Sequence, residues 1–248
     1  MTKIDIRPCK TTEEMEACVQ LQAEVWGFKT EDLVPRRIFV VASKIGGQVI
    51  GAFDGPTLAG FAMAVPGIRS AAPYLHSHML AVREGYRDRG IGRRLKLFQR
   101  DDAINRNIAL MEWTFDPLEL KNAYFNIAKL GAIVRRYTHS FYGLTSSALQ
   151  AGLPTDRLHA EWWLQSPRVK SFLAGHTGKP KIVKQVAVPA AVADWKQDVA
   201  TRQQALDVQS RVAAELETAF AQGLTIVGFS REPKGDGVYE LGPAPEGI

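Results

Sequence analysis

Residues 86–96, YRDRGIGRRLK, place five basic residues and two glycines in eleven positions. The start of a helix has unpaired backbone N–H groups, and the helix dipole adds partial positive charge there. Glycines let that backbone come close to phosphate oxygens, and arginines supply further donors. The stretch therefore predicts a site for a small polyanion. The alternative is a glycine turn that only starts a helix with a solvated basic face.

The basic residues of the chain are concentrated around this stretch. The formal net charge is +5, and residues 83–106 alone hold eight Arg or Lys against four Asp or Glu. The rest of the chain is nearly balanced. Nucleic-acid-binding proteins more often spread basic side chains along a face or a tail. The local surplus therefore favours a small anionic ligand, and we expect no nucleic-acid partner.

Candidate proton-transfer residues flank the same segment. His76 and His78 lie two apart in YLHSHMLAV, and this spacing places both on one side of a strand. Histidine suits general base catalysis near neutral pH, and Glu112 in ALMEWTF is a second candidate base. Two structural histidines are an equally good interpretation. A two-histidine metal site fits the spacing too, but no third ligand is nearby, so we expect no metal.

The hydrophobic pattern and the turn residues indicate the elements that position these side chains. Expected helices cover 12–26, 36–46, 91–106, 122–132 and 194–222. Expected strands cover 48–54, 58–67, 74–82, 109–115, 133–143, 157–164 and 185–190, with a hairpin over 224–242. A loop is expected over 66–73. The helix after the glycines is expected to bury Ile91, Leu95, Leu97, Phe98 and Ile104.

The order of these elements narrows the choice of possible folds. Two helices, a hairpin and a strand precede the glycine turn, and helix–strand–helix–strand follows it. The motif LAVREGYRDRGIGRRL carries R-x-x-G-x-G at Arg87, Gly90 and Gly92. Together they resemble the GNAT superfamily of acyl-CoA-dependent N-acyltransferases over about residues 4–143. The resemblance implies an α+β fold with a mixed, mostly antiparallel sheet flanked by helices, in a domain over 1–145.

The resemblance also implies how coenzyme A would bind. Backbone groups of the turn would hold the pyrophosphate, and the strand at 80–82 would pair with the pantetheine arm and polarise the thioester carbonyl. The co-substrate would be acetyl-CoA or another short acyl-CoA, such as succinyl-CoA. The residues expected to bind it are Leu80, Ala81, Val82, Arg87, Arg89, Gly90, Ile91, Gly92, Arg93 and Asn122.

The proton donor for the leaving thiolate departs from the family pattern. Many members have a tyrosine four residues before the glycine that ends the later helix, and this chain has Ile127 there. Tyr124 either substitutes as the acid or packs in the core. Tyr137 and Tyr142 are further options. The catalytic residues expected are therefore His76, Glu112 and Tyr124, and the departure also leaves open a non-catalytic acyl-CoA sensor.

The second part of the chain, 146–248, is expected to form a C-terminal α/β extension that walls off the acceptor pocket. The chain resembles a longer bacterial subgroup of predicted acetyltransferases with such an extension. Arg157 is a candidate for binding a substrate carboxylate, and Glu161 and His78 for binding the amine. An added wall favours a small-molecule amine, for instance an amino acid, over a protein acceptor. Local ion pairing and packing of these residues is the alternative.

The amino-acid composition indicates the class of protein and the cellular compartment in which it works. The chain has 248 residues with 46% hydrophobic and 23% charged residues, which is typical of a globular protein. No apolar run approaches the ~20 residues of a membrane helix, and the N-terminus does not resemble a secretory signal. Two cysteines without a CxxC motif fit a reducing compartment. We expect a cytoplasmic protein without a membrane partner, and a homodimer is compatible with it.

Overall fold

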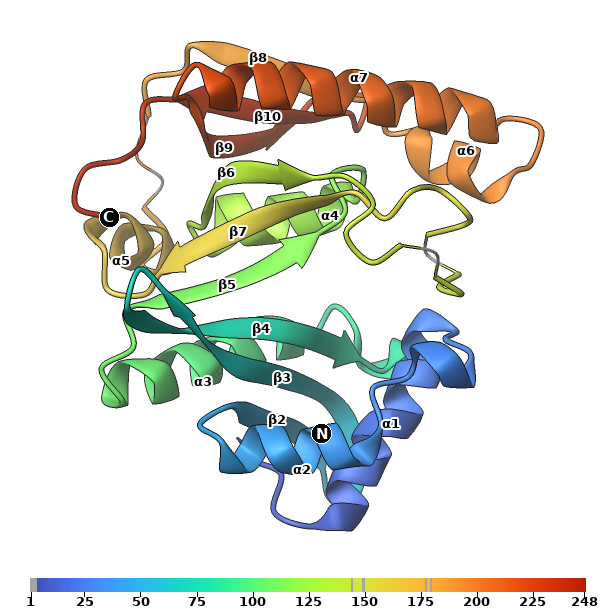
Figure 1. Cartoon of the computed structure of the whole chain (residues 1–248), viewed down its shortest axis with the longest axis vertical. Coiled ribbons are helices and arrows are strands. Elements are labelled where there is room, and N and C mark those ends of the chain that lie inside the picture. Colours follow the sequence, from blue (N-terminus) through green and yellow to red (C-terminus); the bar gives the residue numbers. More distant parts are fainter. Residues whose placement is uncertain (1–3, 144, 149, 177, 179) are drawn as a thin grey trace. The chain divides into compact units, whose positions relative to one another are not determined.

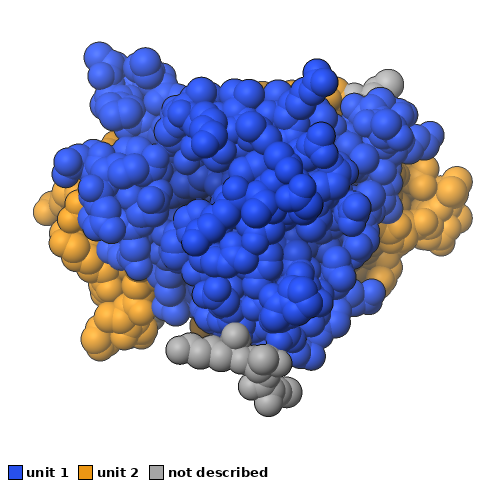
Figure 2. Space-filling model, turned by 90° about the horizontal axis from the view of Figure 1, so that it is seen from below, with its two compact units in different colours: residues 1–112, 145–149 blue, residues 113–144, 150–248 orange. Residues whose placement is uncertain are grey.

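The computed structural model describes residues 4–143, 145–148, 150–176, 178 and 180–248 (Figure 1). The chain forms two compact units, each described separately below. Unit 1 comprises residues 1–112 and 145–149, and unit 2 comprises 113–144 and 150–248 (Figure 2). The division falls inside a strand at 112/113. The domain boundary expected at 145/146 stays a prediction.

Unit 1 is a mostly antiparallel sheet covered by helices on both faces. Its strands follow the order β1-β2-β3-β4-β5, and only β4 and β5 are parallel. The strands are β1 (Asp5–Pro8), β2 (Gln48–Asp54), β3 (Thr57–Arg69), β4 (Ala72–Val82) and β5 (Leu110–Phe115), of which 110–112 belong to this unit. The helices are α1 (Thr12–Trp26), α2 (Arg36–Lys44) and α3 (Ile91–Asn105).

The core of unit 1 lies in two layers, one on each face of the sheet. Alternate strand residues such as Phe61 and Met63 pack with α1 and α2. Their neighbours, such as Ala62, pack with Ile91 and Leu95 of α3. Strand side chains alternate between faces, so hydrophobic residues on both faces need a cover on both. The helix α1 begins as expected, because Thr11 and Glu14 form a complete capping box.

Unit 2 contains the end of β5 and the C-terminal half of the chain. Its strands follow the order β5-β7-β6-β9-β10-β8, and the pairs β6–β7, β6–β9, β9–β10 and β10–β8 are antiparallel. They are β6 (Ile133–Thr138), β7 (Arg157–Trp163), β8 (Lys184–Val188), β9 (Thr225–Arg231) and β10 (Gly237–Gly242). The helices are α4 (Leu120–Ala123), which continues as the π-helix η3 (Tyr124–Lys129), and α5 (Pro167–Leu173), α6 (Val192–Gln197) and α7 (Arg202–Ala221).

The local structure differs from the expectations in several places. The expected loop over 66–73 is a tight hairpin between β3 and β4, because Ser70 and Ala71 adopt positive φ angles of 49° and 62°. The expected helix over 194–222 is two helices, because Asp198 is extended and its carboxylate accepts the Ala200 N–H at 2.9 Å. The short strand β1 was not expected at all.

Candidate acyl-CoA site

A left-handed turn joins β4 to α3 in unit 1. After β4 the chain makes one 3₁₀ turn, η2 (Glu84–Tyr86), and Asp88 and Gly90 then adopt φ angles of 61° and 73°. Gly90 is the N-cap of α3 and, as a glycine, has no side chain with which to cap the helix. The first N–H groups of a helix lack partners within it, so the start of α3 suits an anion. A Cβ at Gly90 would meet no atom within 4 Å, so the turn needs glycine for its φ angle rather than for space.

Arginine side chains surround this turn. Arg87, Arg89 and Arg93 are exposed. Arg87 Nε donates to Val82 O at 3.3 Å, and the Arg89 guanidinium lies 5.2 Å from the ring centre of Tyr86. These contacts hold two guanidinium groups beside the start of α3. Exposed cations beside uncapped N–H groups favour a polyanion.

The strand before the turn presents its residues to both faces of the sheet. Leu80 and Val82 pack on the α3 side, whereas Ala81 packs with α1 and α2. Gly92, in the first turn of α3, lies over this strand, because a Cβ there would be 3.5 Å from Leu80 Cδ2. Strand 80–82 and the glycine turn are thus adjacent in one unit. Their assignment to coenzyme A stays a prediction.

The two base candidates of unit 1 lie opposite each other. The parallel register of β4 and β5 pairs His76 with Glu112. The His76 and His78 rings are 6.0 Å apart between centres, so the spacing did place the two histidines together. Burial lowers the pKa of His78 below its usual value, which favours a neutral ring. Glu112 is 4% exposed and forms an ion pair with Arg69.

The tyrosine candidates belong to unit 2 and differ in their surroundings. Tyr124 is 36% exposed, so its packing in the core is ruled out, and the Lys129 ammonium lies 5.2 Å from its ring centre. Ile127 is fully buried. Tyr137 donates to Asp156 Oδ2 at 2.6 Å, and burial raises its pKa. Tyr142 is exposed, and its hydroxyl is 3.1 Å from Thr114 Oγ1. Exposure therefore favours Tyr124 and Tyr142 over Tyr137 as acids.

The helical segment that carries Tyr124 is irregular. Its hydrogen bonds include Leu130 N–H to Phe125 O at 3.0 Å, which spans five residues and defines a π-helix. Single π turns inside α-helices occur frequently at functional sites. Asn122 is exposed on α4, two residues before the π-helix begins at Tyr124. The sequence predicted a helix here, but it did not indicate that residues 124–129 would form a π-helix, which has a wider turn than an α-helix.

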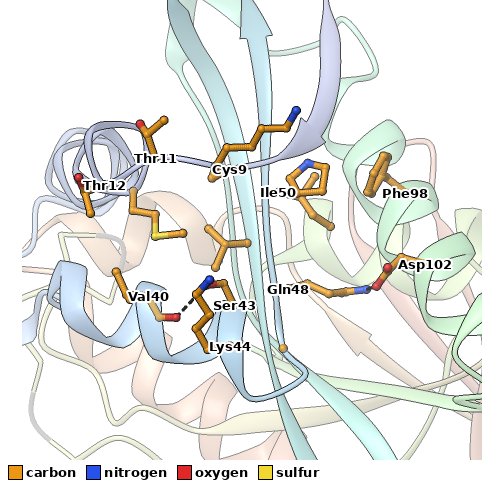
Figure 3. A pocket seen from close by; sticks show the side chains of 15 residues that line it. Cys9, Thr11, Thr12, Val40, Ser43, Lys44, Gln48, Ile50, Phe98 and Asp102 are labelled. Carbon is orange, nitrogen blue, oxygen red and sulfur yellow. Dashed lines mark hydrogen bonds between the residues drawn. The ribbon is translucent and has the colours of Figure 1, made fainter.

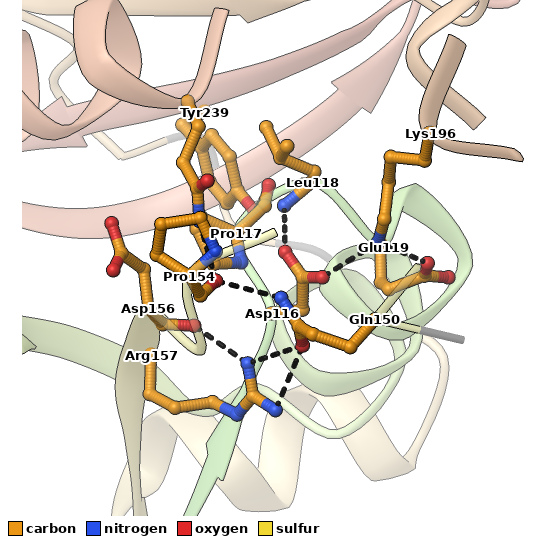
Figure 4. A network of polar contacts seen from close by, with 11 residues as sticks. Asp116, Pro117, Leu118, Glu119, Gln150, Pro154, Asp156, Arg157, Lys196 and Tyr239 are labelled. Carbon is orange, nitrogen blue, oxygen red and sulfur yellow. Dashed lines mark hydrogen bonds and ion pairs between the residues drawn. The ribbon is translucent and has the colours of Figure 1, made fainter. Parts of the chain in front are cut away.

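The expected acceptor-binding residues of unit 2 have partners within the unit, and Figure 4 shows those of Arg157. Both terminal nitrogens of Arg157 donate to Gln150 Oε1 at 3.2 Å, and one also donates to Asp156 O at 2.8 Å. Glu161 is buried and forms an ion pair with Arg135. These contacts occupy the Arg157 guanidinium and the Glu161 carboxylate, which are the groups expected to bind an acceptor. The assignment of Arg157 and Glu161 to an acceptor therefore stays a prediction with less support.

A buried ion pair network in unit 2 was not predicted. Lys196 on α6 is 1% exposed, and its Nζ lies 2.8 Å from Asp116 Oδ2 and 3.2 Å from Glu119 Oε1. The other oxygen of Asp116 accepts the Leu118 N–H, and Tyr239 donates to Pro117 O. The network holds the segment between β5 and α4 (Figure 4). No local pattern signals it, because its partners lie about 80 residues apart.

Unit 1 also has a cavity of about 440 Å³ where β1 ends and β2 begins (Figure 3). Apolar side chains such as Met15, Val40 and Phe98 line it together with Lys44 and Asp102. Gln48 on its wall donates to Asp102 Oδ2 at 2.7 Å. None of the residues expected to bind coenzyme A or to transfer protons lines this cavity.

Two kinds of feature are absent from the part of the chain that the structure describes. No group of three or more His, Cys, Asp or Glu that would hold a metal ion occurs among them. None of the helices in the described ranges has the length and hydropathy needed to cross a membrane.

Comparisons with known proteins agree with this geometry. Residues 12–124 match the model of the acetyltransferase (GNAT) family. No curated protein sequence matches the chain. Among solved structures, the ribosomal-protein-S18-alanine N-acetyltransferase from Escherichia coli is 13% identical with a TM-score of 0.52, covering 73% of this chain and 100% of its own.

Two further solved structures resemble the chain to the same degree. NAA60 of Arabidopsis thaliana in complex with acetyl-CoA is 16% identical with a TM-score of 0.52, covering 65% of this chain and 99% of its own. An aminoglycoside 6′-acetyltransferase type Ii is 17% identical with a TM-score of 0.51, covering 64% and 97%. These likenesses confirm the expected mixed, mostly antiparallel fold. The matched segment, with its glycine turn and flanking strands, is an acetyltransferase domain of the GNAT family of acyl-CoA-dependent acyltransferases.

Proposed function

We propose that the protein is an N-acyltransferase that moves an acetyl or other short acyl group from acyl-CoA to the primary amine of a small molecule. The observation that carries the proposal is the glycine-capped N-terminus of α3 at Gly90, bordered by exposed arginines. It follows β4 after the short turn η2, and β4 carries His76 opposite Glu112. The proposed pyrophosphate site and a base candidate would thus lie on neighbouring segments of unit 1.

The donor would be held by groups of unit 1. The α3 N–H groups and the side chains of Arg87, Arg89 and Arg93 would bind the pyrophosphate. The backbone of β4 around Ala81 would pair with the pantetheine arm, and an N–H there would stabilise the oxyanion. When bound, acyl-CoA supplies the acyl group and a thiolate leaving group. The amine nitrogen bonds to the carbonyl carbon, the C–S bond breaks, and the amine proton passes to a base.

The base is better assigned to His76 than to Glu112. The Glu112 carboxylate is buried and already paired with Arg69, so its oxygens are engaged in an ion pair rather than open to an incoming amine. A primary amine has a pKa of about 8–10.4, so a modest base with a pKa near neutrality is sufficient. Tyr124 remains the candidate for protonating the leaving thiolate.

The acceptor is proposed to be a small amine, and an α-amino acid is the first class to test. The support is the extra part of the chain beyond the matched segment, residues 125–248, which contains five further strands and three helices of its own among the described residues. The acceptors in the names of the solved structures are diverse, since one is a ribosomal-protein-S18-alanine N-acetyltransferase and another an aminoglycoside 6′-acetyltransferase. The acceptor must therefore be found by experiment.

Thiol release from acetyl-, propionyl- and succinyl-CoA, measured with separate pools of amino acids and polyamines, tests the proposal. Release that depends on one pool is the expected result, and dividing that pool identifies the acceptor. Gly92→Glu is the blank, because a carboxylate at the turn would repel the pyrophosphate. A Cβ at Gly92 makes only ordinary contacts, so this variant should fold. No release from any pool, in protein that binds CoA, would indicate the acyl-CoA sensor instead.

A further inference from the structure

A buried lysine lies beneath β4, where the sequence predicts a solvated face. Lys96 is 4% exposed and sits on α3 between Leu95 and the other buried positions of that helix. Gln99, one turn later, is fully buried. Lysine is almost never buried in this way without a polar partner. The burial of Lys96 therefore indicates a role that an exposed lysine on α3 would not have.

The Lys96 amine is connected to the strand above it. Its Nζ donates to Ser77 Oγ at 2.7 Å, and Ser77 Oγ donates to Gln99 Oε1 at 3.0 Å. The backbone oxygen of Gln99 accepts a bond from Gln48 on β2 at 2.9 Å. The helix α3 thus reaches β4 through Ser77 and β2 through Gln48. Polar networks that are buried in this way specify one arrangement of the elements they join.

Ser77 lies at an irregularity of β4. Along β3, Met63 pairs with Met79 and Val65 pairs with His76, so three steps of β4 oppose two steps of β3. Ser77 and Leu80 consequently both face α3, although they are three residues apart. Strict alternation would place them on opposite faces. Such β-bulges re-aim side chains and are found next to active sites.

The bulge lies between His76 and Met79 and so includes Ser77 and His78. His76 and His78 flank Ser77, and their rings are 6.0 Å apart between centres. We propose that Lys96 is a positioning residue that, through its bond to Ser77, holds the β4 bulge and thereby the orientation of His76. The proposal rests on the proposed function, since His76 is the base only if the protein transfers acyl groups.

The environment of the amine suits this role. Burial lowers the pKa of Lys96 to about 7, since a charged amine would lose its hydration there. A neutral amine both donates and accepts hydrogen bonds, and it avoids most of the cost of a buried charge. A lysine on the exposed face of α3 would keep its charge, so its ammonium group would donate hydrogen bonds but accept none.

Variants that break the Lys96–Ser77 bond from either end test the proposal. Lys96→Met and Ser77→Ala should each lower kcat for acyl transfer at least tenfold, while the dissociation constant of CoA stays within twofold of the parent. The kcat of the double variant should be no lower than that of the more impaired single variant, because both substitutions remove the same Lys96–Ser77 interaction. Ser77→Thr keeps the hydroxyl and should restore kcat to within threefold of the parent. Lys29→Met, the same change at an exposed position, should leave kcat unchanged.

Several results would overturn the proposal. Parental kcat in Lys96→Met or in Ser77→Ala would do so, as would additive losses in the double variant. Equal impairment in Ser77→Thr and Ser77→Ala would show that the hydroxyl is not what matters. If Lys96→Met does not fold, Ser77→Ala still carries the test, because it removes only one oxygen atom from the interior.

Amide hydrogen exchange separates this inference from the proposed function, because it needs no turnover. In Lys96→Met, exchange should become faster in peptides covering β4 at 72–82 and stay unchanged in peptides covering α2 at 36–44. Unchanged exchange in β4, or equal acceleration in both segments, would contradict a local role for Lys96. A parent protein that transfers no acyl group would refute the proposed function while this measurement still decides whether Lys96 holds the bulge.

Discussion

His76 on β4 and Glu112 on β5 are register partners on two parallel strands, and the Glu112 carboxylate is paired with Arg69. This relationship distinguishes the two base candidates. The Glu112 carboxylate is buried and already has a charged partner, whereas the His76 ring is half-buried, and histidine is the residue type that suits general base catalysis near neutral pH.

His76→Ala should lower kcat/KM for acyl transfer about 10²-fold near pH 7. The deficit should shrink as the pH rises, because the acceptor amine then loses its proton without help. Glu112→Gln should cost less than tenfold. The measurement is kcat/KM against pH for the three proteins. A His76→Ala profile that superimposes on the parent's, or a larger loss in Glu112→Gln, would remove His76 from the mechanism.

Alanine substitutions at the two glycines of the turn should have opposite effects on stability. Gly90 has a φ angle of 73°, so Gly90→Ala should lower the free energy of unfolding by about 1–2 kcal/mol. Gly92 is in the first turn of α3, and a Cβ there makes ordinary contacts, so Gly92→Ala should be neutral or slightly stabilising. Urea unfolding of both variants is the measurement. Equal destabilisation would mean that Gly92 is needed for packing.

The buried amine of Lys96 should make stability depend on pH. Its pKa is lowered to about 7 in the folded protein from an ordinary value of 10.5. Between these values the unfolded chain binds one more proton than the folded chain, so the free energy of unfolding rises with pH by up to about 1.4 kcal/mol per pH unit. Below about pH 7 the full cost of the buried amine is present. Lys96→Met lacks this dependence.

Urea unfolding of the parent and of Lys96→Met at pH 7, 8 and 9 checks this expectation, since the other titrating groups cancel in the difference. The parent should gain stability relative to the variant at each step. A constant difference between the two proteins would show that the Lys96 amine keeps an ordinary pKa.

Loss of the buried cation in unit 2 should be costly. Lys196→Met leaves the buried Asp116 carboxylate without its ammonium partner, which typically costs about 3–5 kcal/mol. Lys170→Met, a change at an exposed position of α5, is the matched control and should cost less than about 0.5 kcal/mol. Thermal or urea unfolding measures both. Equal stability of the two variants would mean that the network contributes nothing net.

Most elements of the fold could be predicted because their signals are local. The Thr11–Glu14 capping box marked the start of α1, and Gly90 marked the start of α3. The turn at Ser70 and Ala71 could not be predicted, because neither residue normally adopts a positive φ angle. The break between α6 and α7 was hidden for a similar reason. The sequence 198–201 contains neither proline nor glycine, and an aspartate that bonds to its own backbone interrupts the helix.

The sequence by itself determined the glycine turn before α3, the order of most elements and hence the resemblance to the GNAT family, since glycine conformation, helix polarity and strand periodicity act over a few residues. Only the tertiary structure decided which polar residues face the interior. Lys96 and Lys196 look like surface lysines in the sequence, and they are buried because strands or loops from distant parts of the chain pack over them. The pairing of His76 with Glu112 was decided in the same way, because register is a property of two strands and not of either one.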